Sequence, residues 1–264
     1  MWVESHAGES WQTRGAKFFQ AEAVVLKRSE SGEADRVLTL YSLEYGKLRA
    51  MAYGSARPTS RKRGATQPFC RSRFFLVRGK ELHRVDQAEV LEHFPAISED
   101  VERLGLAGYF AELLNGFMPE EIPNRPLYHL LVEALRLLGP AEPETLARAF
   151  EIRLLTLTGF GPELDHCVAC SGSLPPGESS AFSPGAGGVL CPACRRGYGD
   201  ASTILPGTLQ TLRRLREGDL SRVPTVRVSP VIRQELGRVL PEAVAFHLGY
   251  RPRAFAFLSQ VKKG

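Results

Sequence analysis

The hydrophobic period of the chain changes near Pro95, and this change limits what the chain can fold into more than any other feature. From Gln20 to Glu92, apolar and polar residues tend to alternate, which is typical of strands with one buried face. After Pro95, apolar residues recur every three or four positions, which is the period of amphipathic helices. The sequence therefore predicts an α+β protein in which strands form one domain and helices form another.

Five short strands are predicted before the change of period. Their turns fall at Ser31-Gly32, Tyr45-Gly46-Lys47 and Arg78-Gly79-Lys80, where glycine permits tight backbone conformations. We expect the strands to close into a small barrel, because closure removes the exposed edges of an open five-stranded sheet. The predicted strands are residues 22–28, 36–43, 48–54, 69–78 and 81–91.

Three helices are predicted in residues 94–160, with starts at the capping residue Ser98, at Asn124 and at Glu144. Each carries one apolar stripe, and such stripes need partners, so we expect the helices to pack together. The stripes consist of Leu106, Phe110, Leu113 and Phe117; of Leu127, Leu131 and Leu138; and of Leu146, Phe150, Leu154 and Leu157.

A different composition, rich in Gly, Pro, Ser and Cys, separates these helices from the C-terminal part of the chain. Helix is expected again from Pro206 and from Pro230, and Pro241 is expected to kink or restart the last helix. The predicted units are a polar tail (1–19), a barrel domain (20–93), a first helical part (94–160), a cysteine-containing module (161–199) and a second helical part (200–264).

Four cysteines in the module have the spacing C-x2-C, twenty residues, C-x2-C. Two thiolates separated by two residues can point at one ion from a tight turn, and two such pairs complete a tetrahedral Zn²⁺ site. Because thiolates fill all four positions, we expect the zinc to be structural. Two disulfides or four free thiols are the alternatives, and His166 is an alternative ligand beside the first pair. The predicted ligands are Cys167, Cys170, Cys191 and Cys194.

Charge is distributed unevenly along the chain, although the net charge is only +5. Residues 45–80 contain ten Lys or Arg and no acidic residue, residues 81–166 have a net charge of −10, and residues 205–264 have a net charge of +7. Solubility alone would scatter both signs. A polyanionic partner is therefore indicated, and nucleic acid is the first candidate.

Basic and aromatic residues share faces of the predicted strands, because side chains two positions apart point the same way. Basic groups neutralise phosphates and exposed rings stack on unpaired bases, so this combination favours single-stranded nucleic acid. The segment 57–63 is expected to act as a mobile phosphate clamp. The alternative is that the aromatic rings fill the barrel and the basic residues form a solvated fringe. The candidate contacts are Lys47, Arg49, Arg57, Arg61, Lys62, Arg63, Arg71, Arg73 and Phe75.

The common catalytic sequence motifs are missing. The chain contains no nucleotide-binding glycine loop, no H-E-x-x-H zinc motif and no G-x-S-x-G elbow, and its six His residues are scattered. We therefore expect no enzymatic activity. The N-terminus lacks the features of a secretion signal and no apolar run is long enough to span a membrane, which predicts a cytoplasmic protein.

Several segments of the chain resemble the bacterial recombination mediator RecO family. The stretch "VVLKRSESGEADRVLTLYSLEYGKLRAMAYGSARPTSRKRG" is similar to that family's opening strands, and "FEIRLLTLTGFGPELDHCVAC" and "GGVLCPAC" are similar to its helical and zinc segments. The segment "HLGYRPRAFAFL" resembles its last helix and tail. The resemblance runs from about residue 20 to the C-terminus, and the Gly-Phe-Gly-Pro run before the first cysteine pair is its most specific part.

This resemblance implies an oligonucleotide-binding (OB) barrel, a helical-bundle domain and an inserted zinc module, without enzymatic turnover. It implies binding of single- and double-stranded DNA and annealing of complementary strands. The implied partners are RecR, the single-stranded-DNA-binding protein and, indirectly, the RecA recombinase, which is loaded onto coated DNA. A zinc-containing transcription or RNA-binding adaptor is the alternative function, and a nuclease with clustered carboxylates is a third.

Overall fold

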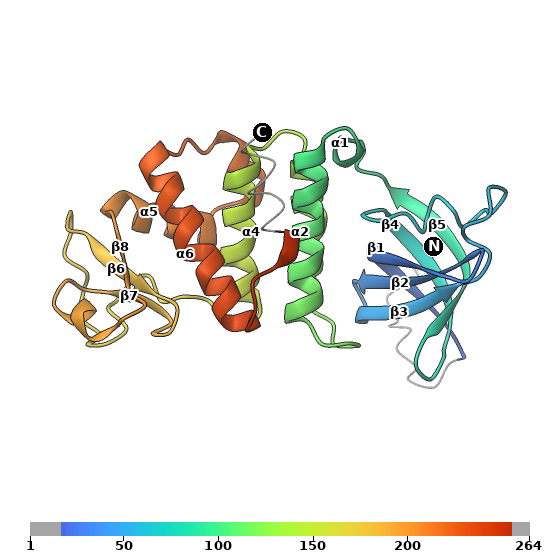
Figure 1. The fold of residues 1–264 in the computed structure, drawn as a ribbon, viewed down its shortest axis with the longest axis horizontal. Coiled ribbons are helices and arrows are strands. Elements are labelled where there is room, and N and C mark those ends of the chain that lie inside the picture. Colours follow the sequence, from blue (N-terminus) through green and yellow to red (C-terminus); the bar gives the residue numbers. More distant parts are fainter. Residues whose placement is uncertain (1–16, 255–264) are drawn as a thin grey trace, which may run out of the picture.

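A computed structural model describes residues 17–254 and shows an elongated molecule with three regions in a row. The strands β1–β5 lie at one end, the long helices occupy the middle and the small sheet β6–β8 lies at the other end (Figure 1). The predicted α+β architecture is therefore confirmed. Most of the predicted N-terminal tail lies outside the described residues, and the prediction that the tail extends to residue 19 is wrong, because the first strand starts at Phe18.

The N-terminal domain is a closed barrel with the strand order β1-β2-β3-β5-β4. Neighbouring strands are antiparallel except β3 and β5, which run parallel and pair at only two positions, Ala50 with His83 and Met51 with Arg84. The long strand β1 pairs with both β2 and β4, which is how five strands close into a ring. The strands are β1 (Phe18–Ser31), β2 (Asp35–Ser42), β3 (Gly46–Ala52), β4 (Arg71–Val77) and β5 (His83–Glu92).

The barrel interior is filled by small and aliphatic side chains together with Phe74. Phe74 and Leu76 on β4 are fully buried, whereas Phe75 between them is exposed, so the predicted alternation along this strand is confirmed. The prediction that the strand starts at Phe69 is wrong. Phe69 has a left-handed backbone with φ 62° and packs against the helical core, and β4 starts two residues later.

The helical domain is built around α4, which contacts α2, α5, α6 and also α3. Its core contains most of the predicted stripe residues, including the stacked rings of Phe110 and Phe150, whose centroids are 4.1 Å apart. A buried polar contact also joins two helices, because Tyr109 donates a hydrogen bond of 2.7 Å to Glu151. The helices are α1 (Pro95–Ser98), α2 (Val101–Phe117), α3 (Arg125–Leu137), α4 (Pro143–Leu157), α5 (Pro206–Glu217) and α6 (Pro230–Leu248), with a 3₁₀ turn η2 (Leu220–Thr225).

Two details of the helices differ from the sequence prediction. Ser98 ends the short helix α1, and Asp100 caps the long helix α2 by accepting a hydrogen bond from the Arg103 amide. Pro241 does not restart the last helix, because α6 continues through it to Leu248. Packing of α6 against α4 and α5 supplies the stabilisation that one missing backbone hydrogen bond removes.

The cysteine-containing region forms a three-stranded antiparallel sheet in the order β7-β6-β8. Its strands are β6 (Ser180–Ser183), β7 (Gly188–Leu190) and β8 (Ser202–Ile204). The strand β8 follows both cysteine pairs, so the folded unit extends beyond residue 199. Phe182, Val189 and Ile204 join the helical core, and they attach the sheet to the helices.

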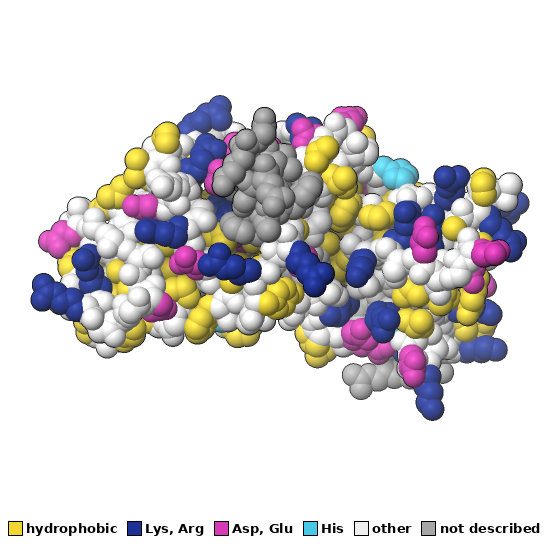
Figure 2. Space-filling model, viewed as in Figure 1, with side chains coloured by type: hydrophobic (Ala, Val, Ile, Leu, Met, Phe, Trp, Pro, Cys, Tyr) yellow, Lys and Arg dark blue, Asp and Glu magenta, His cyan; other side chains and the backbone are white. Residues whose placement is uncertain are grey.

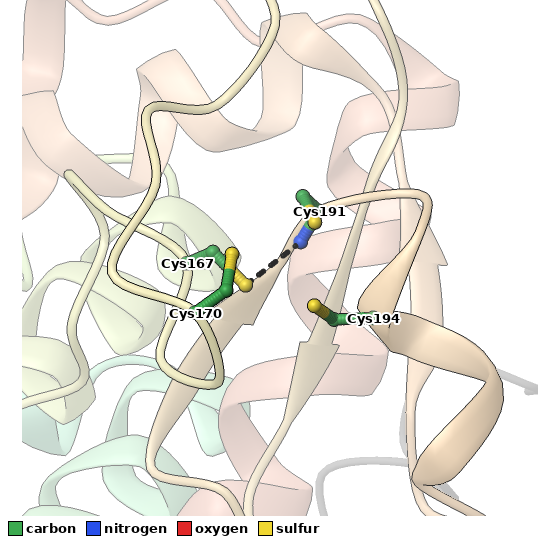
Figure 3. Close-up of side chains that lie close together, drawn as sticks. All are labelled: Cys167, Cys170, Cys191 and Cys194. Carbon is green, nitrogen blue, oxygen red and sulfur yellow. Dashed lines mark hydrogen bonds between the residues drawn. The ribbon is translucent and has the colours of Figure 1, made fainter.

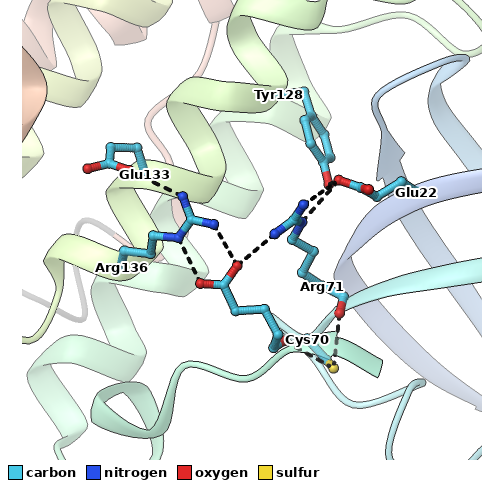
Figure 4. A network of polar contacts seen from close by, with 7 residues as sticks. Glu22, Cys70, Arg71, Tyr128, Glu133 and Arg136 are labelled. Atoms are coloured by element: carbon cyan, nitrogen blue, oxygen red, sulfur yellow. Dashed lines mark hydrogen bonds and ion pairs between the residues drawn. The ribbon is translucent and has the colours of Figure 1, made fainter. Parts of the chain in front are cut away.

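A network of charged side chains joins the barrel to the helices (Figure 4). Arg71 of β4 forms ion pairs of 2.8 Å with Glu22 and 2.9 Å with Glu92. Glu92 also pairs at 2.7 Å with Arg136 of α3, and Tyr128 of α3 donates a hydrogen bond of 2.9 Å to Glu22. Three neighbouring strands of the barrel, β1, β4 and β5, are therefore fixed to the same helix. None of the helices in residues 17–254 has the length and hydropathy that crossing a membrane would require.

Candidate nucleic-acid interface and metal centre

The outer face of the barrel carries both exposed rings and basic groups. Phe75 is 41% exposed and lies between Gln20 of β1 and Gln87 of β5, and Tyr53 at the end of β3 is 53% exposed. These two rings are therefore outside the barrel, which is the arrangement that base stacking requires. Lysine and arginine side chains are spread over this end of the molecule, with hydrophobic and acidic side chains between them (Figure 2).

Within the connection between β3 and β4, residues 55–67 form a loop of successive turns, which we call the basic loop. Its backbone forms successive turn hydrogen bonds, such as those from Ser60 to the Arg57 carbonyl and from Arg63 to the Ser60 carbonyl. Ser55, Ala65 and Thr66 are buried and anchor both of its ends. The sequence predicted a mobile clamp, whereas the structure shows a loop held by internal hydrogen bonds. These hydrogen bonds hold the backbone from which the basic side chains extend.

Four of the predicted contact residues have guanidinium groups without a carboxylate partner among the described residues. Arg57, Arg61 and Arg63 of the basic loop are exposed, as is Arg49 of β3. Lys62 is half-buried, and its ammonium lies 3.4 Å from the carbonyl oxygen of Val85. These groups keep most of their charge available for phosphates.

Three other predicted contact residues already have partners. Arg71 belongs to the network of Figure 4, where burial disfavours its charge but the hydrogen bonds to Glu22 and Glu92 outweigh burial and raise its pKa. The ammonium of Lys47 donates a hydrogen bond of 2.8 Å to the carbonyl of Asn115, and burial lowers its pKa. Arg73 pairs with Glu89 at 3.4 Å on the barrel surface.

The structure adds two arginines that the sequence prediction missed. Arg28 at the end of β1 donates a hydrogen bond of 2.6 Å to Gln67, at the end of the basic loop. Burial, together with the positive charges of Arg28 and Arg63, lowers the pKa of Arg36. Positive charge from β1, from β2 and from the basic loop therefore lies close together at one end of the barrel. The strand order of the barrel could have indicated this accumulation of charge, because the β1–β2 turn meets the basic loop at the same end.

The four predicted cysteine ligands converge at one point in the terminal module (Figure 3). Their sulfur atoms all lie within 4.8 Å of one another, and the five cysteines of the described residues are free thiols. A tetrahedral Zn²⁺ with Zn–S bonds of about 2.3 Å separates its sulfurs by about 3.8 Å, so the arrangement fits such an ion. The cluster contains the four cysteines without His166.

Backbone groups around the cysteines favour thiolates. Burial raises the pKa of Cys167, but N–H groups of Cys191, Cys170 and Ala169 outweigh burial and lower the pKa to about 6. Hydrogen bonds that the Cys194 thiol donates to neighbouring cysteines, Cys191 first, raise the pKa of Cys194 to about 12. A divalent cation held by the four cysteines would stabilise all four thiolates together and so remove this difference. The cluster is therefore consistent with a metal site.

Comparison with known proteins decides the family. A family model described as "Recombination protein O N terminal" matches residues 17–94, and one described as "Recombination protein O C terminal" matches residues 98–254. The chain belongs to the RecO family. RecO proteins are non-enzymatic mediators of recombinational DNA repair, and this chain is accordingly a recombination mediator with DNA and other recombination components as its partners.

Curated relatives agree with this assignment over almost the whole length of the chain. The DNA repair protein RecO of Desulforudis audaxviator is 46% identical over 245 residues, which are 93% of this chain and 98% of the relative. The DNA repair protein RecO of Pelotomaculum thermopropionicum is 42% identical over 244 residues, or 92% of this chain and 94% of the relative. The resemblance that the sequence motifs indicated is therefore confirmed.

Proposed function

We propose that this RecO-family chain binds single- and double-stranded DNA through the basic loop and the neighbouring outer face of the barrel, and anneals complementary strands. With RecR it would then help to load RecA onto DNA coated by the single-stranded-DNA-binding protein. Such work places the protein in the cytoplasm, associated with the nucleoid. Neither ATP nor a catalytic group is needed for these steps.

One observation carries the DNA-binding proposal: Arg57, Arg61 and Arg63 are exposed and have no carboxylate partner within residues 17–254, and their loop is itself anchored. Groups of this kind hold a strand by its phosphates and leave the base edges free. Neutralising phosphates lowers the repulsion between two strands, and free base edges allow them to pair. Annealing follows from these two properties together.

We also propose that the four cysteines hold a structural Zn²⁺. Thiolates would occupy every coordination position, so the ion has no place for a water or substrate. Its role is to fold the module, because few apolar residues other than Ala181 and Leu190 pack around the cysteines. The metal thereby supports the sheet β6–β8, whose other face attaches to the helical core.

Annealing of two complementary strands, each precoated with single-stranded-DNA-binding protein and without ATP, tests the proposed function. The wild type is compared with a charge reversal of the basic loop, Arg61→Glu, Lys62→Glu and Arg63→Glu. The matched control reverses Arg195, Arg196 and Arg214, which are exposed at the opposite end of the molecule. This control changes the net charge by the same amount.

We expect the wild type and the control to anneal the strands and the loop variant to lose most of this activity. Equal activity of all three proteins would remove the basic loop from the mechanism. RNA competitor strands added to the same assay distinguish an RNA-binding adaptor, because such a protein would be titrated by RNA at lower concentration than by DNA.

A further inference from the structure

An aromatic hollow lies where the barrel meets the helices, next to the basic loop. Its volume is about 360 Å³, and its walls include Gln67 and Phe69 before β4, His93 and Phe94 after β5, and Leu104 of α2. Small-molecule sites in proteins occupy roughly 300–1,000 Å³, so this hollow, which we call the junction pocket, is large enough for one planar ring system. It lies apart from Phe75, on the outer barrel face.

The backbone at Phe69 is held in a conformation that aromatic residues rarely adopt. Its φ angle is 62°, and its N–H group donates a hydrogen bond of 2.8 Å to the carbonyl of Val25. Such strain persists where the surrounding structure imposes it, and it is frequent at ligand sites. Here it turns the chain away from the strand direction and brings the ring to the junction pocket instead of the barrel wall.

Charge around the junction pocket is opposite on its two sides. Gln67 in the pocket wall accepts a hydrogen bond from Arg28 and donates one to the carbonyl of Arg63, so basic residues border the barrel side. Glu99 and Asp100 follow the pocket residue Ser98 at the α1–α2 corner, and Glu102 and Arg103 precede the pocket residue Leu104, so acidic residues outnumber basic ones on the helical side. A phosphate backbone is attracted to the first side and repelled from the second.

We propose that the junction pocket takes a single unstacked nucleobase of a DNA strand whose phosphates lie along the basic loop. This inference rests on the proposed DNA binding and adds a specific position for one base. The phosphate backbone of the DNA stays on the basic side of the junction pocket. One base points away from the phosphates into the pocket, where it can stack on the rings of Phe69 and Phe94. Stacking on rings needs no particular base, so the site would be tolerant of sequence.

Double-stranded DNA cannot use the pocket without losing a base pair. The pocket therefore favours single strands over duplexes, whereas the basic loop attracts both. This difference gives the protein a physical reason to release a strand once it has paired with its complement. The released base leaves the pocket, and only the phosphate contacts remain.

Photochemical cross-linking tests the position of the base. An oligonucleotide with one 5-iodouracil is bound to the full-length protein and irradiated, and the cross-linked peptides are identified by mass spectrometry. We expect cross-links in the peptides that contain Phe69 or residues 93–94. Cross-links confined to other rings, such as Phe18 or Phe75 on the outer barrel face, would overturn the proposal.

A matched pair of substitutions tests the contribution of the pocket to affinity. Leu104→Glu places a charged side chain in the pocket, and we expect the variant to fold because the residue is already 47% exposed. Val101→Glu introduces the same charge one turn earlier on α2, at a position that is 60% exposed and does not line the pocket. Both variants differ from the wild type by the same net charge.

We expect Leu104→Glu to raise the Kd for single-stranded DNA about tenfold, which corresponds to about 1.4 kcal/mol, and Val101→Glu to raise it less than twofold. The Kd for duplex DNA should change less than twofold in both. Equal effects of the two substitutions on Kd would show only long-range repulsion of the DNA and would overturn the proposal that the junction pocket binds a base. Absence of DNA binding by the wild type would instead overturn the proposed function itself.

Discussion

Arg71 of the barrel and Arg136 of the helical domain bind the same carboxylate, that of Glu92. The guanidinium–carboxylate distances are 2.9 Å and 2.7 Å, and all three side chains are at least partly shielded from water (Figure 4). Glu92 is the last residue of β5, directly before the chain enters the helices. The link between the two domains is therefore electrostatic as well as covalent.

Loss of Arg71 should destabilise the protein without acting on DNA directly. We expect Arg71→Met to lower the free energy of unfolding by about 1–3 kcal/mol, because hydrogen bonds to Glu22 and Glu92 are lost. The salt dependence of DNA binding should stay the same. Denaturant unfolding and DNA titrations measure both effects. Arg49→Met, at an exposed candidate DNA contact, is the control for the unfolding measurement only. A smaller salt slope for Arg71→Met would return Arg71 to the DNA contacts.

Acid should weaken the same link. Hydrogen bonds from Arg136, and then from Arg71, outweigh burial and lower the pKa of Glu92 below its usual 4.5. The carboxylate therefore stabilises the folded state above this pH, and the contribution is lost as the pH falls through the folded-state pKa. Glu92→Gln should be less stable than the wild type at pH 7, and the difference should shrink in acid. Unfolding curves between pH 3 and 7 test this, with Glu99→Gln as an exposed control.

The salt dependence of DNA binding should identify the basic loop as a contact. Reversal of Arg61, Lys62 and Arg63 should reduce the slope of log K against log salt by roughly 2, since each phosphate contact on a single strand contributes about 0.7. Fluorescence anisotropy at several salt concentrations measures this slope. A weaker affinity with an unchanged slope would mean that the loop acts through the general field of the protein.

Gly46 allows the β2–β3 turn to pack closely against the helical domain, because it has no side chain. A Cβ atom at this position would lie 2.0 Å from the carbonyl oxygen of Ile122, and φ is +69°. We expect Gly46→Ala to lower the free energy of unfolding by at least about 2 kcal/mol. Gly32→Ala is the matched control, because φ is +73° there but no atom lies within 4 Å. Similar losses for both variants would mean that only backbone strain matters.

Metal analysis should find one zinc per chain, and Cys191→Ser should remove it. Binding energy is folding energy at a structural site, so we expect the free energy of unfolding to fall by about 3 kcal/mol or more. Cys70→Ser, which alters a cysteine of the barrel, should keep its zinc. Retention of zinc and stability by Cys191→Ser would exclude the four-cysteine site.

The periodic features of the sequence predicted the fold well, because burial imposes them directly. The alternation of Phe74, Phe75 and Leu76 gave the correct inner and outer faces of β4, and the stripes of the long helices became their core. The paired cysteines predicted a cluster for a similar reason, since the geometry of four thiolates around one ion restricts their spacing.

Features that depend on distant contacts could not be predicted in this way. The sequence near Arg71 does not indicate that this side chain pairs with Glu22 and Glu92 of two neighbouring strands. Nor does the sequence near Lys47 indicate that its ammonium reaches the carbonyl of Asn115 in the helical domain. Phe69 continued an alternating pattern, but a hydrogen bond to Val25 moved it out of the strand. The boundary at Phe18 was missed because its pairing partner, Val77, lies about 60 residues further along the chain.

Closure of the barrel depends on one short seam, where β3 and β5 pair at two positions, while every other strand contact is longer. Thermal opening of the barrel will therefore begin there, and amides along this seam will exchange with solvent hydrogen before those between β1 and β2. The opened form is a curled sheet that stays attached to the helices through the Glu92 link. A nucleic-acid strand bound across the β3–β5 seam would contact both β-strands at once. Such binding should therefore make the barrel harder to open.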